Sequence, residues 1–354
     1  MHCLLLFVVP FLLYIQTFSF DYSYHDDDTI VLYNAKSLHD FDMKKIFLTD
    51  AWMMNKQIEL YRPWQSFTYA IDYIFTGSSA KGYHVHNVII YCISILLFYF
   101  FLLSLNIGEQ NSFLLSLIYS VHFLLAHVVS WLPARGDLYL FAFSISCMLF
   151  FRKYLRTKKI IFVLLSSLFY FLALLSKESA LVLLPILYAV AFLFWKIEWK
   201  KPGNYFLLIP STMLTLLYFW MRLQSISASQ NIFSIEGLIY NLRVIPEEVC
   251  KFFIPAFFSV MPAYSTTVTS IGVGLIILLC SLLFVFRKTI NRNLVLAGGI
   301  LFLVPLLPSL IYTPSFTGFA YDYLDHRMFF PGIGILLIAY SISILIIRKI
   351  LKIF

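Results

Sequence analysis

Ten apolar segments separated by polar connections dominate this 354-residue chain. Hydrophobic residues make up 61% of it and charged residues only 12%, whereas a soluble domain would be about one quarter charged. An apolar segment of roughly 20 residues can cross a bilayer, and a helix satisfies its own backbone hydrogen bonds there. The sequence therefore predicts an all-α polytopic membrane protein with about 10 transmembrane helices. The predicted helices are 3–20, 86–105, 112–130, 138–151, 160–175, 180–195, 204–220, 270–286, 294–312 and 328–347.

The positive charge lies in alternate connections between these segments. One set of connections holds 14 of the 26 Lys and Arg residues but only two acidic residues, Glu109 and Glu198. Because cytoplasmic loops are enriched in Lys and Arg, we expect this set and both termini in the cytoplasm. We read Met1 to Phe20 as an uncleaved first helix. The net charge of +8 is then a topology signal and does not indicate a nucleic-acid partner. The basic connections are 106–111, 152–159, 196–203, 287–293 and 348–354.

Two long connections are predicted on the opposite, outer side of the membrane. The first, 21–85, is long enough to carry short interfacial helices. The second, 221–269, contains an apolar stretch at 251–262 that includes Pro255 and is too short to cross, so we interpret it as re-entrant. We expect one integral membrane domain over 1–354. The composition, rich in Phe, Ile and Lys, is typical of AT-rich bacterial genomes, so we expect a bacterial inner membrane with this side facing the periplasm.

Three adjacent carboxylates, Asp26, Asp27 and Asp28, open the first outer loop. Neighbouring carboxylates repel each other, which raises the pKa of at least one of them unless a cation neutralises the cluster. This arrangement suits a general base, or a divalent ion such as Mg²⁺ or Mn²⁺ held by Asp26 and Asp27. We do not expect a cofactor to be required. The alternative is a solvated loop in which Asp28 caps a helix that begins near Thr29.

Three basic residues, Arg62, Lys177 and Arg327, lie beside apolar helix ends on the outer side. An arginine fixed before a proline, as Arg62 is, suits a phosphate because its planar fork donates two parallel hydrogen bonds. An ion pair of Arg62 with the aspartates and a lipid headgroup contact are the alternatives. For Lys177 the alternative is a simple ion pair with Glu178.

Other polar side chains share the outer side. His84 lies at the mouth of the second predicted helix, and His127 lies about one turn below the outer surface on the third. Each can face the loop or can be a satisfied core histidine. Arg135 and Asp137 can pair with each other, which would make them structural. The cytoplasmic side carries no glycine-rich nucleotide loop. We therefore expect an already activated substrate at the outer leaflet, and a sugar on a polyprenyl phosphate fits.

The ordered motifs resemble the GT-C glycosyltransferases, and within them the membrane half of the transmembrane-and-tetratricopeptide O-mannosyltransferases and their bacterial relatives. Departures include Phe123 after His122, His127 in place of an acidic residue, and His326 before Arg327. The tetratricopeptide half has no counterpart in this sequence. The motifs are Asp26-Asp27 with Asn34, Thr49-Asp50-Ala51-Trp52, Tyr61-Arg62-Pro63, Gly82-Tyr83-His84 with Asn87, Trp131 with Arg135 and Asp137, Ser176-Lys177-Glu178-Ser179-Ala180, Pro255 with Tyr264, and Arg327 with Pro331.

This resemblance implies a GT-C fold and sugar transfer from a polyprenyl-phosphate donor to a hydroxyl of a protein or glycan, with inversion at the anomeric carbon. Asp26 or Asp27 would be the base, and Arg62, Lys177 and Arg327 would bind the donor phosphate. The supporting residues would be Asp28, Asn34, His84, His127, Glu178 and His326. Two other functions stay open: a flippase or transporter of a lipid-linked sugar, and a non-catalytic GT-C-like protein in glycan assembly.

Overall fold

The computed structural model describes residues 1–54, 58–198, 200–226, 235–258, 263–311 and 325–350. Every regular element in these ranges is helical, as the sequence predicts. The chain divides into two compact units, which are described separately. The first unit comprises 1–122, 126–187 and 194–230, and the second comprises 123–125, 188–193 and 231–354.

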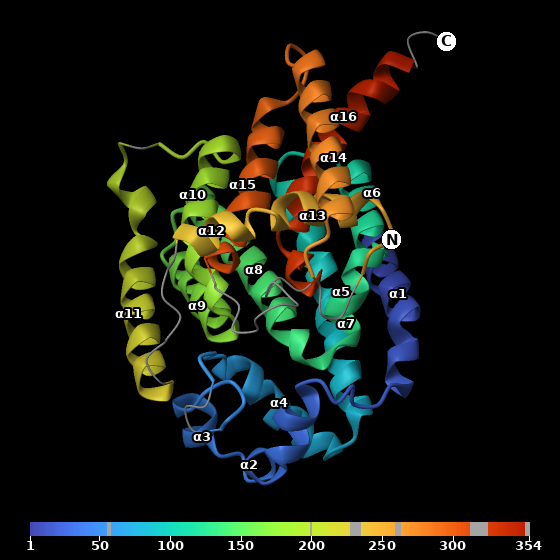
Figure 1. Cartoon of the computed structure of the whole chain (residues 1–354). Coiled ribbons are helices and arrows are strands. Elements are labelled where there is room, and N and C mark those ends of the chain that lie inside the picture. The colour runs from blue at the N-terminus through green and yellow to red at the C-terminus, as the bar shows by residue number, and fades with distance from the viewer. Residues whose placement is uncertain (55–57, 199, 227–234, 259–262, 312–324, 351–354) are drawn as a thin grey trace. The chain divides into compact units, whose positions relative to one another are not determined.

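The first unit contains most of the helices (Figure 1). Its long central helix α8 packs against α9 and α5, and α5 also packs against α1 and α6. The elements are α1 (His2–Tyr14), η1 (Ile15–Ser19), η2 (Thr29–Tyr33), α2 (Ala35–His39), α3 (Met43–Leu48), α4 (Pro63–Thr76), α5 (Ala80–Ser104), α6 (Glu109–Ser120), α7 (Ala126–Ser130), η4 (Leu132–Ala134), α8 (Arg135–Thr157), α9 (Ile161–Ser176), η5 (Glu178–Val182), η6 (Pro202–Tyr205) and α11 (Leu208–Ser225).

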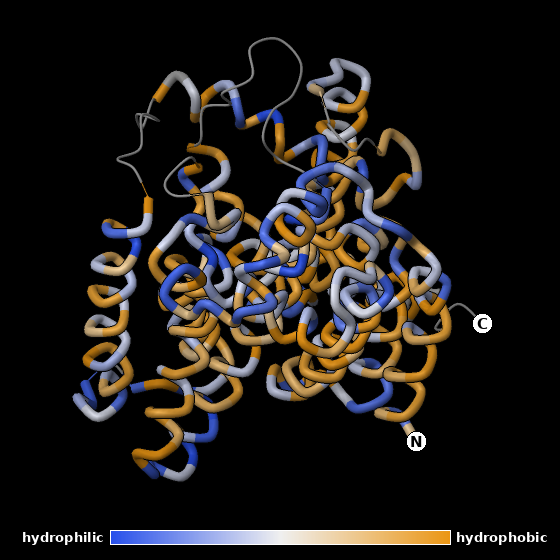
Figure 2. Tube along the Cα trace, turned by 90° about the horizontal axis from the view of Figure 1, so that it is seen from below, coloured by the Kyte–Doolittle hydropathy of each residue, from blue (hydrophilic) through white to orange (hydrophobic). Residues whose placement is uncertain are grey.

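Helix α5 is apolar both on the face that packs against its neighbours and on the face that stays exposed. Val88, Tyr91 and Ile95 are buried against neighbouring helices at the three- and four-residue spacing of one helix face. The opposite face is also apolar, and Ile89 and Ile93 remain exposed on it. Apolar residues likewise predominate along the other helices, while hydrophilic residues gather at helix ends and in the connections (Figure 2). A helix that is apolar on both faces is typical of a membrane span.

Short helices of the predicted first outer loop form a small core of their own within the first unit. Residues from η2, α2 and α3 pack around the aromatic rings of Tyr69 on α4 and Tyr83 on α5. Figure 1 shows α2, α3 and α4 together at one end of this unit, next to the ends of α5 and α7. Helix α5 begins at Ala80, so the last residues of the predicted loop 21–85 are already helical. This core fixes the loop that carries the aspartate cluster.

The second unit consists of α13 packed on α14 and of α15 packed on α16. Gly298 on α15 and Gly334 on α16 allow the backbones of these two helices to approach closely, since a Cβ at either position would clash with the other helix. Lys251 and Phe252 of the predicted re-entrant stretch lie in α13. The elements are η3 (Phe123–Leu125), α12 (Ile235–Asn241), α13 (Val244–Phe253), α14 (Thr266–Val285), α15 (Arg292–Leu310), η7 (Asp325–Phe329) and α16 (Gly332–Ile350). Helix α10 (Leu183–Phe194) belongs partly to each unit.

Six helices of the described residues are long and apolar enough to cross a membrane, or seven if the bent pair formed by 109–120 and 123–130 is one span. Three of the ten predicted segments correspond instead to shorter apolar helices, at 161–176, 178–194 and 332–347. The chain therefore has the composition of a polytopic membrane protein, and the count of 10 stays a prediction. Residues 227–234 and 259–262 of the second predicted loop, residue 312 and the end of the tail lie outside the described residues.

Candidate functional site

Asp27 organises the turn that contains the aspartate cluster. Its side chain is buried. One carboxylate oxygen accepts hydrogen bonds from the backbone N–H of Ser23 at 2.7 Å and from the Ser23 hydroxyl at 2.8 Å. The other oxygen accepts from the backbone N–H of Asp28 at 3.0 Å and of His25 at 3.3 Å. With four donors on its two oxygens, Asp27 holds the turn closed.

Asp26 is placed very differently in the same turn. Its backbone has φ +73°, a left-handed conformation that costs a non-glycine residue free energy and often accompanies function. Its half-buried carboxylate accepts no hydrogen bond from the part of the chain that the structure describes. Burial raises the pKa of Asp26, and the charges of Asp27 and Asp28 raise it further, while His25 and Arg62 oppose the shift. Within the described residues, the Asp26 oxygens are thus left without a hydrogen-bond donor.

Arg62 pairs with Glu178 rather than with the aspartates. Its Nε and one terminal nitrogen donate to the two oxygens of Glu178 at 3.3 and 2.9 Å. Pro63 stands at the first position of α4, so Arg62 is held immediately before a rigid helix start. Glu178 begins η5. The guanidinium remains partly exposed, at 13%, and its charge acts on Asp26.

A second arginine near this pair was missed at the sequence level. Arg222 lies in the last turn of α11 and donates to the backbone carbonyl of Glu59 at 3.2 Å. The phenol of Tyr218, one turn earlier, lies within electrostatic range of Glu178, Arg222 and Arg62. The charges of Arg62 and Arg222 therefore both act on the Tyr218 phenol, together with that of Glu178. Only the turn at the end of α11 brings Arg222 here, and no motif in the sequence indicates it.

Aromatic rings connect the aspartate loop to α7. The indole N–H of Trp131 donates to the backbone carbonyl of His25 at 3.0 Å, and the two rings lie 5.9 Å apart. His127 on α7 packs against the Trp131 ring, and the two ring centroids lie 5.3 Å apart. The expectation that His127 reaches the loop therefore has a structural route, through Trp131.

Lys177, the second predicted phosphate ligand, forms an ion pair with Asp137. Its ammonium group lies 2.7 Å from both carboxylate oxygens of Asp137, and the pair is almost fully buried. Gly136 permits this close packing of α8 on α9, because a Cβ there would lie 3.1 Å from the carbonyl of Ser176. The charge of Lys177 still acts on Glu178. Direct contact of Lys177 with a phosphate would require the pair with Asp137 to open.

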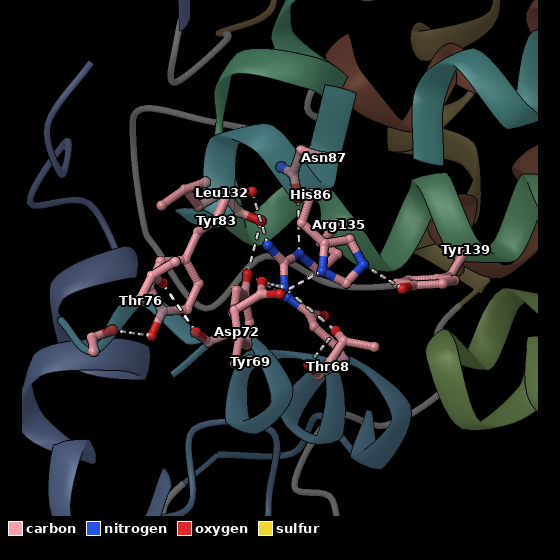
Figure 3. A network of polar contacts seen from close by, with 12 residues as sticks. Thr68, Tyr69, Asp72, Thr76, Tyr83, His86, Asn87, Leu132, Arg135 and Tyr139 are labelled. Atoms are coloured by element: carbon pink, nitrogen blue, oxygen red, sulfur yellow. Dashed lines mark hydrogen bonds and ion pairs between the residues drawn. The ribbon is translucent and has the colours of Figure 1, made fainter. Parts of the chain in front are cut away.

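Arg135 does not pair with Asp137, in contrast to the alternative drawn from the sequence. It is completely buried and donates to Asp72 at 2.5 Å, to Asn87 at 2.7 Å and to the carbonyl of Tyr83 at 2.9 Å (Figure 3). Its guanidinium also lies over the ring of Tyr69, at 4.3 Å. These contacts join α4, α5 and α8, so they indicate a structural function.

Asp72 is also joined to a histidine in this network, which we call the Arg135 network. His86 lies 2.5 Å from Asp72 through Nδ1 and 2.6 Å from the Tyr139 hydroxyl through Nε2 (Figure 3). Burial alone would raise the pKa of Asp72, but Arg135 and His86 together hold it below its usual value. Both nitrogens of His86 are therefore occupied within the network.

The remaining predicted residues of the first unit, Asn34, Asp28 and His84, differ in their hydrogen bonding. Asn34 is buried and donates to the carbonyls of Thr29 and Trp52 at 2.9 and 2.8 Å, which ties η2 to the following loop. Asp28 precedes η2 but its side chain makes no capping hydrogen bond, so the predicted cap is not formed. His84 is buried within α5, edge-on to the ring of Phe20.

His326 and Arg327 belong to η7 of the second unit. Their neighbour Asp325 accepts a hydrogen bond from Lys251 on α13 at 2.6 Å, and Lys251 also contacts Glu248 at 3.2 Å. All three groups are buried, and burial raises the pKa of Glu248 well above its usual value. This cluster fixes η7 against α13. The predicted phosphate contact of Arg327 stays a prediction.

Among the described residues, no three His, Cys, Asp or Glu side chains converge as metal ligands do. The five cysteines there are free thiols. Asp27 uses its oxygens within the loop, as described above. The metal site considered for Asp26 and Asp27 stays a prediction.

Comparison with known proteins finds one distant relationship of interest. The chain is 26% identical over 208 residues to the protein O-mannosyl-transferase F38B6.6 of Caenorhabditis elegans. The match covers 54% of this chain and 28% of the length of that relative. No family model matches the chain, and no solved structure matches it. The resemblance read from the motifs is thus supported by a relative of the expected kind, and membership of the GT-C superfamily stays a prediction.

Proposed function

We propose that this protein is a membrane glycosyltransferase that moves a hexose from a polyprenyl-phosphate donor to an acceptor hydroxyl. The observation that carries the proposal is the pairing of an unoccupied, strained carboxylate, Asp26, with a partly exposed arginine cluster. A base and an anion-binding group are the two parts that such a transfer needs. The distant similarity to a protein O-mannosyl-transferase supports the same reaction class and suggests mannose or a related sugar.

Asp26 is the proposed general base. The acceptor oxygen attacks the anomeric carbon while its proton passes to the Asp26 carboxylate, and the bond from that carbon to the donor phosphate breaks. The leaving phosphate takes the bonding electron pair. A single displacement of this kind inverts the anomeric centre. Burial of Asp26 supports the assignment, because a raised pKa makes the carboxylate a stronger base. Asp27 acts by holding the turn that presents Asp26.

Arg62 and Arg222 are the proposed donor-phosphate ligands. A phosphate leaves without a general acid when nearby cations stabilise its developing charge. Glu178 orients Arg62, because its bidentate contact fixes the Arg62 fork. Lys177 contributes its charge through Glu178, and Arg327 is a further candidate ligand from the second unit. Substituting Arg327 with Ala should chiefly impair donor use, and unchanged donor dependence would remove this residue from the proposal.

The direct test compares Asp26→Asn with Asp21→Asn in membranes at equal expression, using a polyprenyl-phosphate-mannose donor. Both residues lie in the same loop, and the Asp21 side chain is exposed. We expect Asp26→Asn to lower transfer by about 100- to 10,000-fold, the usual contribution of general base catalysis, and Asp21→Asn to leave it unchanged. Transfer at the wild-type rate by Asp26→Asn would refute the base assignment. Lipid-linked sugars that accumulate in a deletion strain, identified by mass spectrometry, would name the donor.

A further inference from the structure

A groove lies between the end of α4 and the first turns of α5, away from the candidate active site. Its volume is about 630 Å³, and its lining is predominantly apolar. Arg62 stands at the other end of α4, 14 residues or about 20 Å along the helix axis. The groove belongs wholly to the first unit. The lining residues are Asp72, Phe75, Thr76, Ser79, Lys81, Gly82, Val85, His86, Ile89 and Ile90.

The apolar wall of the groove runs down one face of α5. Gly82, Val85 and Ile89 follow each other at three- and four-residue spacing, so they share a face, and the Thr76 side chain of α4 packs directly on Gly82. Phe75, which is 81% exposed, stands on the α4 side. The stripe continues beyond the groove through exposed Ile93. Because α5 is long and apolar enough to cross a membrane, we expect this exposed surface to face lipid.

The charge at the mouth of the groove is positive. Asp72 is neutralised by Arg135 and hydrogen-bonded to His86, so its carboxylate does not repel an anion. Lys81 is exposed and forms no ion pair within the described residues. The positive end of the α5 helix dipole lies at the same mouth and adds to the attraction for an anion.

The dimensions of the groove match one leaflet of a bilayer. From Lys81 to Ile90, α5 rises by roughly 13 Å, and half of a hydrocarbon core is about 15 Å thick. A cationic mouth above an apolar wall of this length complements a lipid with a charged headgroup and an acyl chain. We propose that the groove binds one anionic phospholipid of the surrounding bilayer, with its phosphate at Lys81 and an acyl chain along Val85 and Ile89.

The test measures lipid binding directly and does not depend on the transferase reaction. The purified full-length protein is titrated with phosphatidylglycerol or phosphatidylcholine and followed by native mass spectrometry. We expect one phosphatidylglycerol to be retained in preference to phosphatidylcholine. Lys81→Gln should weaken this binding by about fivefold, the usual effect of one lysine near an anionic lipid, and the preference should fade at high salt.

Two further variants separate the parts of the site. Lys36→Gln removes an exposed lysine of the same loop region, on α2, and should bind the lipid as wild type does. Val85→Trp fills the groove without changing charge and should abolish retention of the lipid. Equal binding by Lys81→Gln and Lys36→Gln would overturn the proposal. Competition by inorganic phosphate alone would also overturn it, because it would show an anion site that needs no acyl chain.

Discussion

Two arginine–carboxylate clusters in the first unit have similar composition and opposite character. Around Arg135, the arginine and Asp72 are buried, His86 is partly buried, and each of the three is hydrogen-bonded within the network. Around Arg62, the ion pair with Glu178 is partly exposed, and the nearby Asp26 carboxylate accepts no hydrogen bond within the described residues. In the first cluster the carboxylate is hydrogen-bonded, whereas in the second the Asp26 carboxylate has no hydrogen-bond donor among the described residues.

This difference shows that charge in an apolar chain does not by itself identify a reactive site. Buried charges persist when they are paired and hydrogen-bonded, and such pairs usually join elements of the fold. A carboxylate that is held without a partner, in a strained backbone, costs free energy that the surrounding structure must supply. The unmet capacity for hydrogen bonding, rather than the charge, distinguishes Asp26 from Asp72.

The largest expected effect on stability breaks the Arg135 network. Arg135→Met leaves Asp72 buried without its cation, which should lower the free energy of unfolding by about 3–5 kcal/mol. Thermal unfolding in detergent would measure it. Arg62→Met is the matched control and should cost only about 1 kcal/mol, because its ion pair is partly exposed. Equal losses for the two variants would remove the distinction between the clusters.

Arg62→Met and Arg222→Met should in turn act on the donor. Each loses one cation from the proposed phosphate site, and we expect donor KM to rise by about tenfold, the effect of losing one charge-assisted hydrogen bond. Steady-state kinetics with varied donor at saturating acceptor would measure this. An increase in acceptor KM alone would contradict the proposal, because it would indicate that the arginines bind the acceptor and not the donor.

The pH dependence should reveal the state of Asp26. The base works only when deprotonated, so kcat/KM should fall as the pH drops through a pKa that burial raises above the ordinary value for aspartate, about 3.9. Because the positive charge of Arg62 lowers the pKa of Asp26, Arg62→Met should move the midpoint to still higher pH. A midpoint that moves to lower pH in this variant would contradict the proximity of the two groups.

The smallest effect is expected at a solvated ion pair. Lys201 and Glu198 lie 2.7 Å apart, but both side chains are 62% exposed. Lys201→Gln should change the free energy of unfolding by less than about 1 kcal/mol and leave transfer unchanged. Chemical denaturation alongside the Arg135 variant would place both on one scale.

Much of the candidate site could be foreseen from the sequence, although the partners could not. The aspartates, Arg62 and Glu178 all stand out as polar residues beside apolar segments. The sequence left open whether Arg62 pairs with the aspartates, Lys177 with Glu178, or Arg135 with Asp137. In the structure the partners are Glu178, Asp137 and Asp72, which lie 116, 40 and 63 residues away.

The sequence alone determined that this chain is a bundle of apolar helices with its polar residues gathered in a few loops. Hydropathy is a sum over neighbouring residues, so it can be read without knowing any long-range contact. Only the tertiary structure decided that Asp27 accepts hydrogen bonds within its own turn while Asp26 accepts none from the described residues, and that Arg62 and Arg222 both act on Tyr218. Which carboxylate keeps free oxygens depends on backbone angles and on donors within reach, and residue order does not fix these.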